Sequence, residues 1–335
     1  MTFLNRVAKL TAHGIGAGMP NPALDLPECA SARSLVAEDE RPAAEIAACS
    51  YPELETFITE EDRAFWCYMN PRPRPSFTPQ LLRDLEAMQD CIAGLFDRAA
   101  GGGGERPFDY FVLGSRSAGV FNLGGDLNLF VDKIRARDGA TLRRYGYACV
   151  EAGHANYRGY DNGVITIGLI QGDALGGGFE SALSCDLLVA ERQAKFGLPE
   201  VLFNLFPGMG AYSFLARRIG AVKAEEMILG GRMYTAEEMH ALGVIDVLAE
   251  PGDGQRAVCD YIAGNRGKRN AHSAVYKVRR RVNPVSLQEM RDVVDLWVDA
   301  ALALEETDLR KMLRIATAQD RFRARQSAGS AIAAE

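Results

Sequence analysis

Long hydrophobic runs are missing from this 335-residue sequence. A membrane-spanning helix needs about 18 or more successive apolar residues, and no such run occurs, so the sequence predicts no membrane span. The opening segment, Met1 to Met19, is interrupted by polar residues and glycines and lacks the apolar core of a signal peptide. We therefore expect a cytoplasmic protein.

Paired cysteines are also missing. The seven cysteines show no CxxC pair and no regular spacing; they are Cys29, Cys49, Cys67, Cys91, Cys149, Cys185 and Cys259. This pattern fits neither a disulfide framework nor a zinc site, so reduced thiols and no metal are expected. Only four histidines are present, and His154 and His240, the two that could act as acid–base groups, lie outside any motif. We expect both to have structural roles.

An excess of positive charge is absent, since the formal net charge is −6. That balance argues against a general nucleic-acid-binding protein. One basic run, Lys277-Val-Arg-Arg-Arg, has two interpretations. It is either a solvated helix face or a patch for a phosphopantetheine arm or an acidic carrier protein.

The chain divides into three parts by composition. Residues 1–50 are rich in Ala, Pro and Glu and predict a poorly ordered or peripheral extension; residues 51–250 predict an α/β core, and residues 251–335 a helical region. Four successive glycines at 101–104 lack the Gly-Lys-Ser/Thr of a phosphate-binding loop, so a flexible loop is expected there.

Within the core, periodicity predicts alternating helices and strands. Thr59-Glu-Glu-Asp predicts the start of a helix. The expected strands are Phe65–Met69, Tyr110–Leu113, Val164–Ile170 and Leu187–Ala190, and the expected helices are 78–99, Leu127–Ala155 and one that begins near Phe179. The order strand, helix, strand over 110–170 is that of a parallel crossover unit.

Two glycine-rich segments follow expected strands and lead into helices. They are Phe121-Asn-Leu-Gly-Gly-Asp-Leu and Gly172-Asp-Ala-Leu-Gly-Gly-Gly-Phe-Glu. Glycines there let backbone N–H groups face a ligand, and two such amides converging on one oxygen would form an oxyanion hole. Each cluster alone is better explained as a tight turn packed against a neighbouring helix, whereas the two in this order are more specific.

Two glutamates follow these segments. Glu180 lies at the start of the helix after Gly178, and Glu200 ends Phe196-Gly-Leu-Pro-Glu. A first-turn acid and a solvated loop carboxylate are the structural alternatives. If apolar neighbours such as Leu198, Phe203 and Met209 bury them, their pKa values would rise into the range useful for general acid–base catalysis.

At these motifs the chain resembles the crotonase, or enoyl-CoA hydratase/isomerase, superfamily over about residues 110–249. The resemblance rests on Gly124-Gly125-Asp126, Leu175-Gly-Gly-Gly-Phe-Glu, Cys185-Asp186 and Phe196-Gly-Leu-Pro-Glu. It implies a spiral core of ββα units with helices at the C-terminus, an oxyanion hole formed by the amides of Gly125 and Gly177, and catalysis by Glu180 and Glu200. Gly124 and Gly176 would then contact the substrate.

A narrower resemblance is to the diffusible-signal-factor synthases, carried by the segment from Val201 to Phe214 and by Pro71-Arg-Pro-Arg-Pro-Ser-Phe-Thr-Pro. It implies dehydration of a 3-hydroxyacyl group on acyl carrier protein and hydrolysis to a free cis-2-unsaturated fatty acid, a quorum-sensing signal. Both glutamates would serve dehydration, and one would also direct water during hydrolysis. By the same resemblance, Leu175, Met209, Trp297 and Ile315 would line the acyl tunnel, although ordinary core packing explains Trp297 and Ile315 equally well.

Two other functions remain open at this stage. The first is an enoyl-CoA hydratase or isomerase acting on fatty acyl-CoA, and the second a regulatory protein that binds a membrane sensor kinase. The resemblance implies a thioester substrate, on CoA or carrier protein, and no cofactor. The apolar residues of the C-terminal helices, with the resemblance, predict a homotrimer or hexamer.

Overall fold

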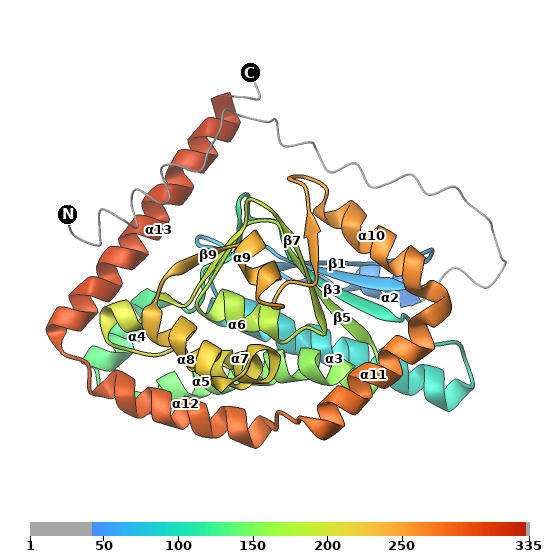
Figure 1. The fold of residues 1–335 in the computed structure, drawn as a ribbon, viewed down its shortest axis with the longest axis horizontal. Coiled ribbons are helices and arrows are strands. Elements are labelled where there is room, and N and C mark those ends of the chain that lie inside the picture. Colours follow the sequence, from blue (N-terminus) through green and yellow to red (C-terminus); the bar gives the residue numbers. More distant parts are fainter. Residues whose placement is uncertain (1–41, 333–335) are drawn as a thin grey trace.

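The computed structural model describes the backbone of residues 42–332 and side chains as far as residue 319 (Figure 1). Most of the predicted N-terminal extension, residues 1–41, therefore lies outside the described residues. The remainder of that segment contains helix α2 (Pro42–Ala48), whose Ile46 is fully buried in the core.

A six-stranded sheet forms the centre of the molecule. Its strand order is β1-β2-β3-β5-β7-β10, and only the β1–β2 pair is antiparallel. The strands are β1 (Leu54–Thr59), β2 (Ala64–Met69), β3 (Tyr110–Ser115), β5 (Ile165–Ile170), β7 (Leu187–Glu191) and β10 (Val247–Ala249). Every residue of β2 and of β5 is buried, as expected for central strands of a parallel sheet that is covered on both faces.

A second, smaller sheet has four short strands in the order β4-β6-β8-β9. They are β4 (Val120–Asn122), β6 (Asp173–Leu175), β8 (Lys195–Gly197) and β9 (Met233–Thr235). β4, β6 and β8 are parallel, and β9 runs antiparallel to β8. Each turn of the chain adds one strand to the large sheet and the next to the small one, as in β3–β4, β5–β6 and β7–β8. This arrangement is the predicted spiral of ββα units.

Helices cover both faces of the sheets. They are α3 (Pro79–Gly102), α4 (Leu127–Arg135), α5 (Gly139–Arg158), α6 (Gly177–Leu183), α7 (Ala211–Ile219), α8 (Ala221–Gly230), α9 (Ala236–Ala241), α10 (Gly254–Asn265), α11 (Arg269–Val282), α12 (Leu287–Leu302) and α13 (Glu306–Ile332), with short 3-10 helices η2 (Gly159–Asp161), η3 (Pro199–Phe203) and η4 (Arg266–Lys268). α11, α12 and α13 run around the periphery of the body (Figure 1).

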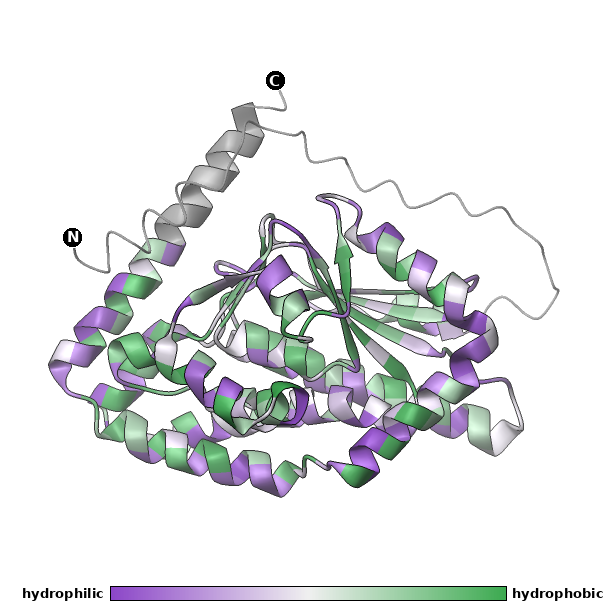
Figure 2. Ribbon diagram, viewed as in Figure 1, coloured by the Kyte–Doolittle hydropathy of each residue, from purple (hydrophilic) through white to green (hydrophobic). Residues whose placement is uncertain are grey.

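The core has two parts. The larger one lies between the large sheet and α3, α5, α6, α7 and α12; the smaller one lies under α10 and includes Trp66 and Val258. Colouring by hydropathy shows the strands as the most apolar part of the interior and the peripheral helices as mixed (Figure 2). α3 shows how local sequence positions such a helix: Thr78 caps it through a hydrogen bond from Leu81 N, and Leu81, Leu85, Met88 and Ile92 form its buried stripe.

Some predictions of secondary structure were wrong. Thr59-Glu-Glu-Asp does not open a helix, because Glu60 to Arg63 form the turn between β1 and β2. Arg63 has a positive φ of 50° and donates its amide to Glu60 O, which closes the hairpin. Ser, Thr and Asp favour turns as much as helix starts. Likewise, the predicted helix 127–155 is two helices, broken at Arg137 with φ of 51°.

The C-terminal helices pack largely on their own chain. Val294 and Val298 of α12 are buried against α5, where a side-chain carbon on Gly146 would lie 2.5 Å from Val294 Cγ1. This packing accounts for some of the apolar residues in the C-terminal helices that predicted a subunit interface. Leu296, in contrast, is 64% exposed. α11 is held by Arg279 and Arg280, which both pair with the buried Asp186 at 2.6 Å.

Candidate active site

The predicted site residues directly follow three parallel strands of the small sheet. The Gly124-Gly125 turn follows β4, Gly176-Gly177 follows β6, and Glu200 follows β8. Carboxyl ends of hydrogen-bonded parallel strands meet at one edge of a sheet. Segments 75 residues apart in the sequence, from Gly125 to Glu200, are therefore brought together there.

The first turn aims the Gly125 amide. Asn122, fully buried, accepts a hydrogen bond from Gly124 N at 2.7 Å, and Phe77 N donates to Gly124 O at 2.8 Å. Because C=O and N–H point in opposite directions in a trans peptide, the bond to Gly124 O directs the Gly125 N–H away from Phe77 N. Gly124 has φ of 94°, and a side-chain carbon there would lie 2.9 Å from Gly177 N, so glycine is required.

The second turn aims the Gly177 amide. Glu180 N donates to Gly176 O at 3.0 Å in the first turn of α6, so the Gly177 N–H of the same peptide unit points out of the helix start. A side-chain carbon on Gly177 would lie 3.5 Å from Gly125 N, which places both amides beside the same small space. Two amides there can bind one oxygen and stabilise negative charge on it.

Glu180 lies beside these amides and is 2% exposed. Its Oε1 accepts hydrogen bonds from Met209 N at 2.8 Å and Ala211 N at 3.0 Å. Burial raises the pKa of Glu180 to about 7, although the two amides oppose the shift by stabilising the carboxylate.

Glu200 begins η3 and lies against the turn before α6, since a side-chain carbon on Gly176 would be 2.5 Å from Glu200 Oε1. Its Oε2 is buried and has no hydrogen-bond partner. Burial, and next the nearby charge of Glu180, raise the pKa of Glu200 to about 8. Because two amides stabilise the Glu180 carboxylate and Glu200 Oε2 has no donor, a single proton on the pair is favoured on Glu200.

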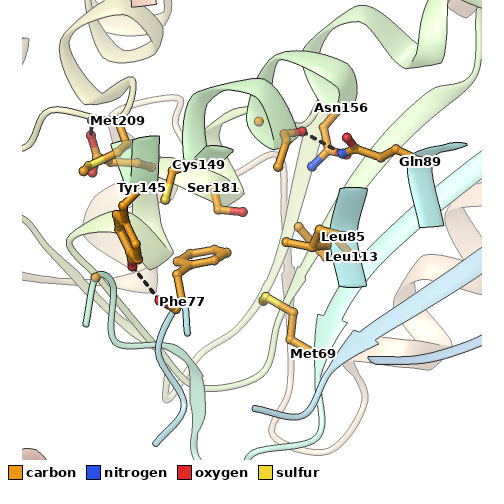
Figure 3. Close-up of a pocket in the computed structure, with 15 residues that line it drawn as sticks. Met69, Phe77, Leu85, Gln89, Leu113, Tyr145, Cys149, Asn156, Ser181 and Met209 are labelled. Atoms are coloured by element: carbon orange, nitrogen blue, oxygen red, sulfur yellow. Dashed lines mark hydrogen bonds between the residues drawn. The ribbon is translucent and has the colours of Figure 1, made fainter. Parts of the chain in front are cut away.

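A cavity of about 30 Å³ opens beside Glu180, Gly125 and Gly177 (Figure 3). At the opposite end from Met209, the side chains of Met69, Leu85 and Leu113 form an apolar wall (Figure 3). Ser181 lies between the two ends, and the polar groups of Gln89 and Asn156 lie on the same side as the apolar wall, away from Met209 (Figure 3). The cavity thus has Glu180 and the glycine amides at one end and a mainly apolar wall with two amide side chains at the other.

The structure places most predicted site residues together. Gly125, Gly177, Glu180 and Met209 line the cavity, and Glu200 contacts the adjoining turn. Gly124, Leu175 and Gly176 form the two turns themselves: Leu175 O and Gly177 N both approach Gly124.

Trp297 and Ile315 lie elsewhere. Trp297, 2% exposed, packs on Gly208 and on Phe130, whose ring centroid is 5.0 Å away. Ile315 is half-buried against the core on α13. Neither lines the cavity, so their contact with an acyl chain stays a prediction.

Sequence reasoning missed the walls contributed by α3 and α5. Leu85 and Gln89 lie on α3, and Tyr145, Cys149 and Asn156 on α5. The apolar stripe of α3 was recognised, but periodicity cannot distinguish a side chain that packs on the core from one that faces a cavity.

The other predicted polar features have structural contacts. His154 Nε2 contacts Val285 O at 3.2 Å and His240 Nδ1 contacts Ile245 O at 2.9 Å. In the basic run, Arg279 and Arg280 pair with Asp186, so these two are not a free patch. Among residues 42–332, no group of three acidic, cysteine or histidine side chains is placed to hold a metal ion, and no helix has the length and hydrophobicity to span a membrane.

Comparison with known proteins agrees with this geometry. Residues 104–255 match the enoyl-CoA hydratase/isomerase family. The enoyl-CoA hydratase of Bacillus halodurans has the same fold, with a TM-score of 0.65 and 23% identity over 79% of this chain and 99% of that one. The matched residues include both glycine turns and both glutamates.

Other known proteins are similar to parts of this chain. The fatty acid oxidation complex subunit alpha of Pseudomonas syringae pv. tomato is 36% identical over 151 residues, which are 45% of this chain and 20% of that protein. The probable enoyl-CoA hydratase of Rhizobium meliloti is 42% identical over 85 residues, 25% of this chain and 33% of that protein. The chain thus spans a third or less of the length of these two curated relatives. DspI of Pseudomonas aeruginosa shares the fold with a TM-score of 0.56 and 24% identity, over 71% of this chain and 92% of that one.

Proposed function

We propose that this protein adds water to, or removes water from, the Cα–Cβ bond of an acyl thioester. The observation that carries the proposal is the pair Glu180 and Glu200, with raised pKa values, beside the converging amides of Gly125 and Gly177. Proton transfer next to a thioester carbonyl needs stabilisation of the enolate oxygen and a base and an acid of matched pKa. The four groups supply those needs.

Each residue has a separate role in this proposal. The Gly125 and Gly177 amides bind the thioester oxygen and stabilise the enolate. In hydration, the Glu180 carboxylate takes a proton from the attacking water, and the Glu200 carboxylic acid donates a proton to Cα; dehydration reverses both transfers. A single carboxyl group would suffice for shifting a double bond, so the presence of two favours hydration chemistry over simple isomerisation. The chemistry requires a CoA or carrier-protein thioester and no further cofactor.

The acyl tail would enter the cavity toward Met69, Leu85 and Leu113. Apolar walls of this kind bind hydrocarbon through the hydrophobic effect. The cavity volume of about 30 Å³ is small, so a long chain would require side chains of the wall to move.

A narrower form of the proposal is a diffusible-signal-factor synthase, which dehydrates 3-hydroxyacyl carrier protein and then hydrolyses the thioester to a free cis-2-unsaturated acid. The Val201–Phe214 segment supports it by resemblance, and Met209 N within that segment binds Glu180. Binding of acyl carrier protein or a membrane sensor kinase belongs to this narrower form. Assembly as a trimer or hexamer is proposed from the broader resemblance to the crotonase superfamily.

The test is product analysis by mass spectrometry. The purified protein is incubated with 2-enoyl-CoA and, separately, with 3-hydroxyacyl carrier protein. Hydrated CoA thioester establishes the hydratase, whereas free cis-2-enoic acid from the second substrate establishes the synthase. Glu180→Gln and Glu200→Gln should each abolish turnover. Inertness of the wild-type protein toward both substrates would refute the proposal and leave a binding role.

A further inference from the structure

Tyr145 of α5 lies directly behind the Gly125 turn. Its side chain is 6% exposed and lines the cavity. The hydroxyl group donates a hydrogen bond to Phe77 O at 2.5 Å and accepts one from Asp126 N at 3.1 Å (Figure 3 shows the first). One hydroxyl therefore joins two backbone segments that are remote in the sequence.

These two bonds complete a closed set of contacts around Gly125. The peptide unit before Gly125 is held through Gly124 O, which accepts from Phe77 N at 2.8 Å. The peptide unit after Gly125 is held through Asp126 N, which donates to Tyr145. Because Tyr145 also binds Phe77 O, the same hydroxyl restrains the residue that holds the first peptide unit. Both peptide planes next to Gly125, and hence the direction of its N–H, depend on Tyr145.

Aromatic packing restrains the same turn from the side. The rings of Tyr145 and Phe130 are perpendicular with centroids 5.1 Å apart. Phe130 covers Gly125 so closely that a side-chain carbon there would lie 2.5 Å from the Phe130 ring. The Tyr145 ring thus supports the residue that covers Gly125, and its hydroxyl orients the backbone.

The hydroxyl group is unsuited to proton transfer. Burial raises the pKa of Tyr145 well above its ordinary value, so the group stays neutral throughout the physiological range. A neutral hydroxyl can donate to Phe77 O and accept from Asp126 N at the same time. The role of the hydroxyl group is therefore to orient the backbone around Gly125.

We propose that Tyr145 is a positioning residue that holds the Gly125 N–H in the direction needed to bind the thioester oxygen. This inference rests on the proposed function, in which the Gly125 amide polarises that carbonyl group. Oxyanion-hole N–H groups stabilise the transition state because they already point toward the oxygen before the reaction. Loss of one such donor typically lowers kcat by about 10²- to 10³-fold. A misdirected donor should cost part of that factor.

The test is Tyr145→Phe, which keeps the ring against Phe130 and removes both hydrogen bonds. We expect kcat for 2-enoyl-CoA to fall by about tenfold or more with KM little changed, since the donor acts mainly in the transition state. Isotope-edited infrared spectroscopy of a bound, non-reacting acyl-CoA should also show the carbonyl stretch shifting toward its frequency in free solution.

Tyr157→Phe is the matched control. Tyr157 lies on the same helix, and its hydroxyl also bridges backbone groups, accepting from Val285 N at 3.0 Å and donating to Asn283 O at 3.4 Å, away from the cavity. The Tyr157→Phe variant should have a lower melting temperature, with kcat and the carbonyl frequency unchanged. Equal effects of the two variants on all three quantities, or an unchanged kcat and frequency in Tyr145→Phe, would overturn the proposal.

A second variant covers the case in which Tyr145→Phe does not fold. Replacing Tyr145 with 4-aminophenylalanine fills the same space and keeps a donor for Phe77 O but accepts poorly from Asp126 N. We expect a folded protein with reduced kcat; full activity would reject the role of the Asp126 contact. If wild-type protein binds the acyl-CoA but does not turn it over, the proposed function fails, and the carbonyl frequency alone still decides the role of Tyr145.

Discussion

At the residue scale, Glu200 combines a buried, unpaired Oε2 with a second carboxyl group nearby. A carboxylate in that position lacks the donors that Glu180 receives from Met209 N and Ala211 N. The asymmetry supports the opposite roles proposed for these two identical side chains, and it makes the ionisation of Glu200 costly for the folded state.

Activity should follow a narrow bell-shaped pH profile. The productive state needs Glu180 ionised and Glu200 protonated, so kcat/KM should fall below about pH 7 and above about pH 8. Steady-state rates of hydration across that range provide the measurement. In Glu180→Asp, any residual activity should keep two limbs, and a flat profile for the wild-type protein would contradict the assigned protonation states.

Glu200→Gln should stabilise the protein while it abolishes catalysis. The pKa of Glu200 rises from 4.5 to about 8 on folding, so the folded state binds more protons than the unfolded state between those values. The stabilisation from the protonated group is therefore present at low pH and is lost as pH rises toward 8, by up to about 1.4 kcal/mol per pH unit. Glutamine cannot ionise, so the variant's gain in melting temperature should grow from about pH 5 to about pH 8 and then level off. Glu226→Gln, an exposed change on α8, is the control and should show no such trend.

At the element scale, Asp186 ties the C-terminal helices to the core. It is 3% exposed, pairs with Arg279 and Arg280 of α11, and accepts a hydrogen bond from Thr166 N at 3.2 Å. Burial raises the pKa of Asp186 even though the arginines oppose the shift, so the carboxylate depends on its partners.

Arg280→Ala should destabilise the protein by about 3–5 kcal/mol, because it removes a 10%-exposed guanidinium from a buried carboxylate. Arg281→Ala, on the exposed side of the same helix, should change stability by less than about 0.5 kcal/mol. Chemical denaturation measures both free energies of unfolding. Similar values for the two variants would show that Arg279 alone satisfies Asp186.

The elements differ in how far the sequence predicts them. β2 and β5 are continuous apolar runs and were found, whereas β1, with mixed burial, and β6 and β9, with three residues each, carry too little pattern. The glycine turns and both glutamates were singled out because four motifs, in order along the chain, resemble those of the crotonase superfamily. Tyr145 was missed because its partner Phe77 is 68 residues away and only the fold brings them together.

At the scale of the whole molecule, the cavity joins the large sheet, the small sheet and the helices α3, α5 and α6. The end at Glu180 is formed by the turns that follow β4 and β6, and the far wall includes Met69 of β2, Leu113 of β3 and Leu85 of α3. Chain-length preference should therefore depend on the far wall, independently of the catalytic groups.

Leu85→Ala should shift the preferred substrate toward longer acyl chains. Leu82→Ala is the control, because Leu82 is also 6% exposed on α3 but does not line the cavity. Both changes should lower the free energy of unfolding by about 2–5 kcal/mol. The measurement is kcat/KM for a series of 2-enoyl-CoA substrates. A shift in both variants, or in neither, would mean that the acyl chain takes another path, such as one toward Trp297 and Ile315.

The small sheet that carries the site has strands of only three residues, whereas the strands β2, β3 and β5 beside it have six. Few ladder bonds hold such strands, and segments of low local stability open without unfolding the rest of a protein. Hydrogen exchange at the amides of β6 should therefore be faster than at those of β3. Heat should then abolish catalysis before the large sheet unfolds. The temperature of inactivation would therefore measure the stability of β4, β6 and β8 and not that of the whole fold.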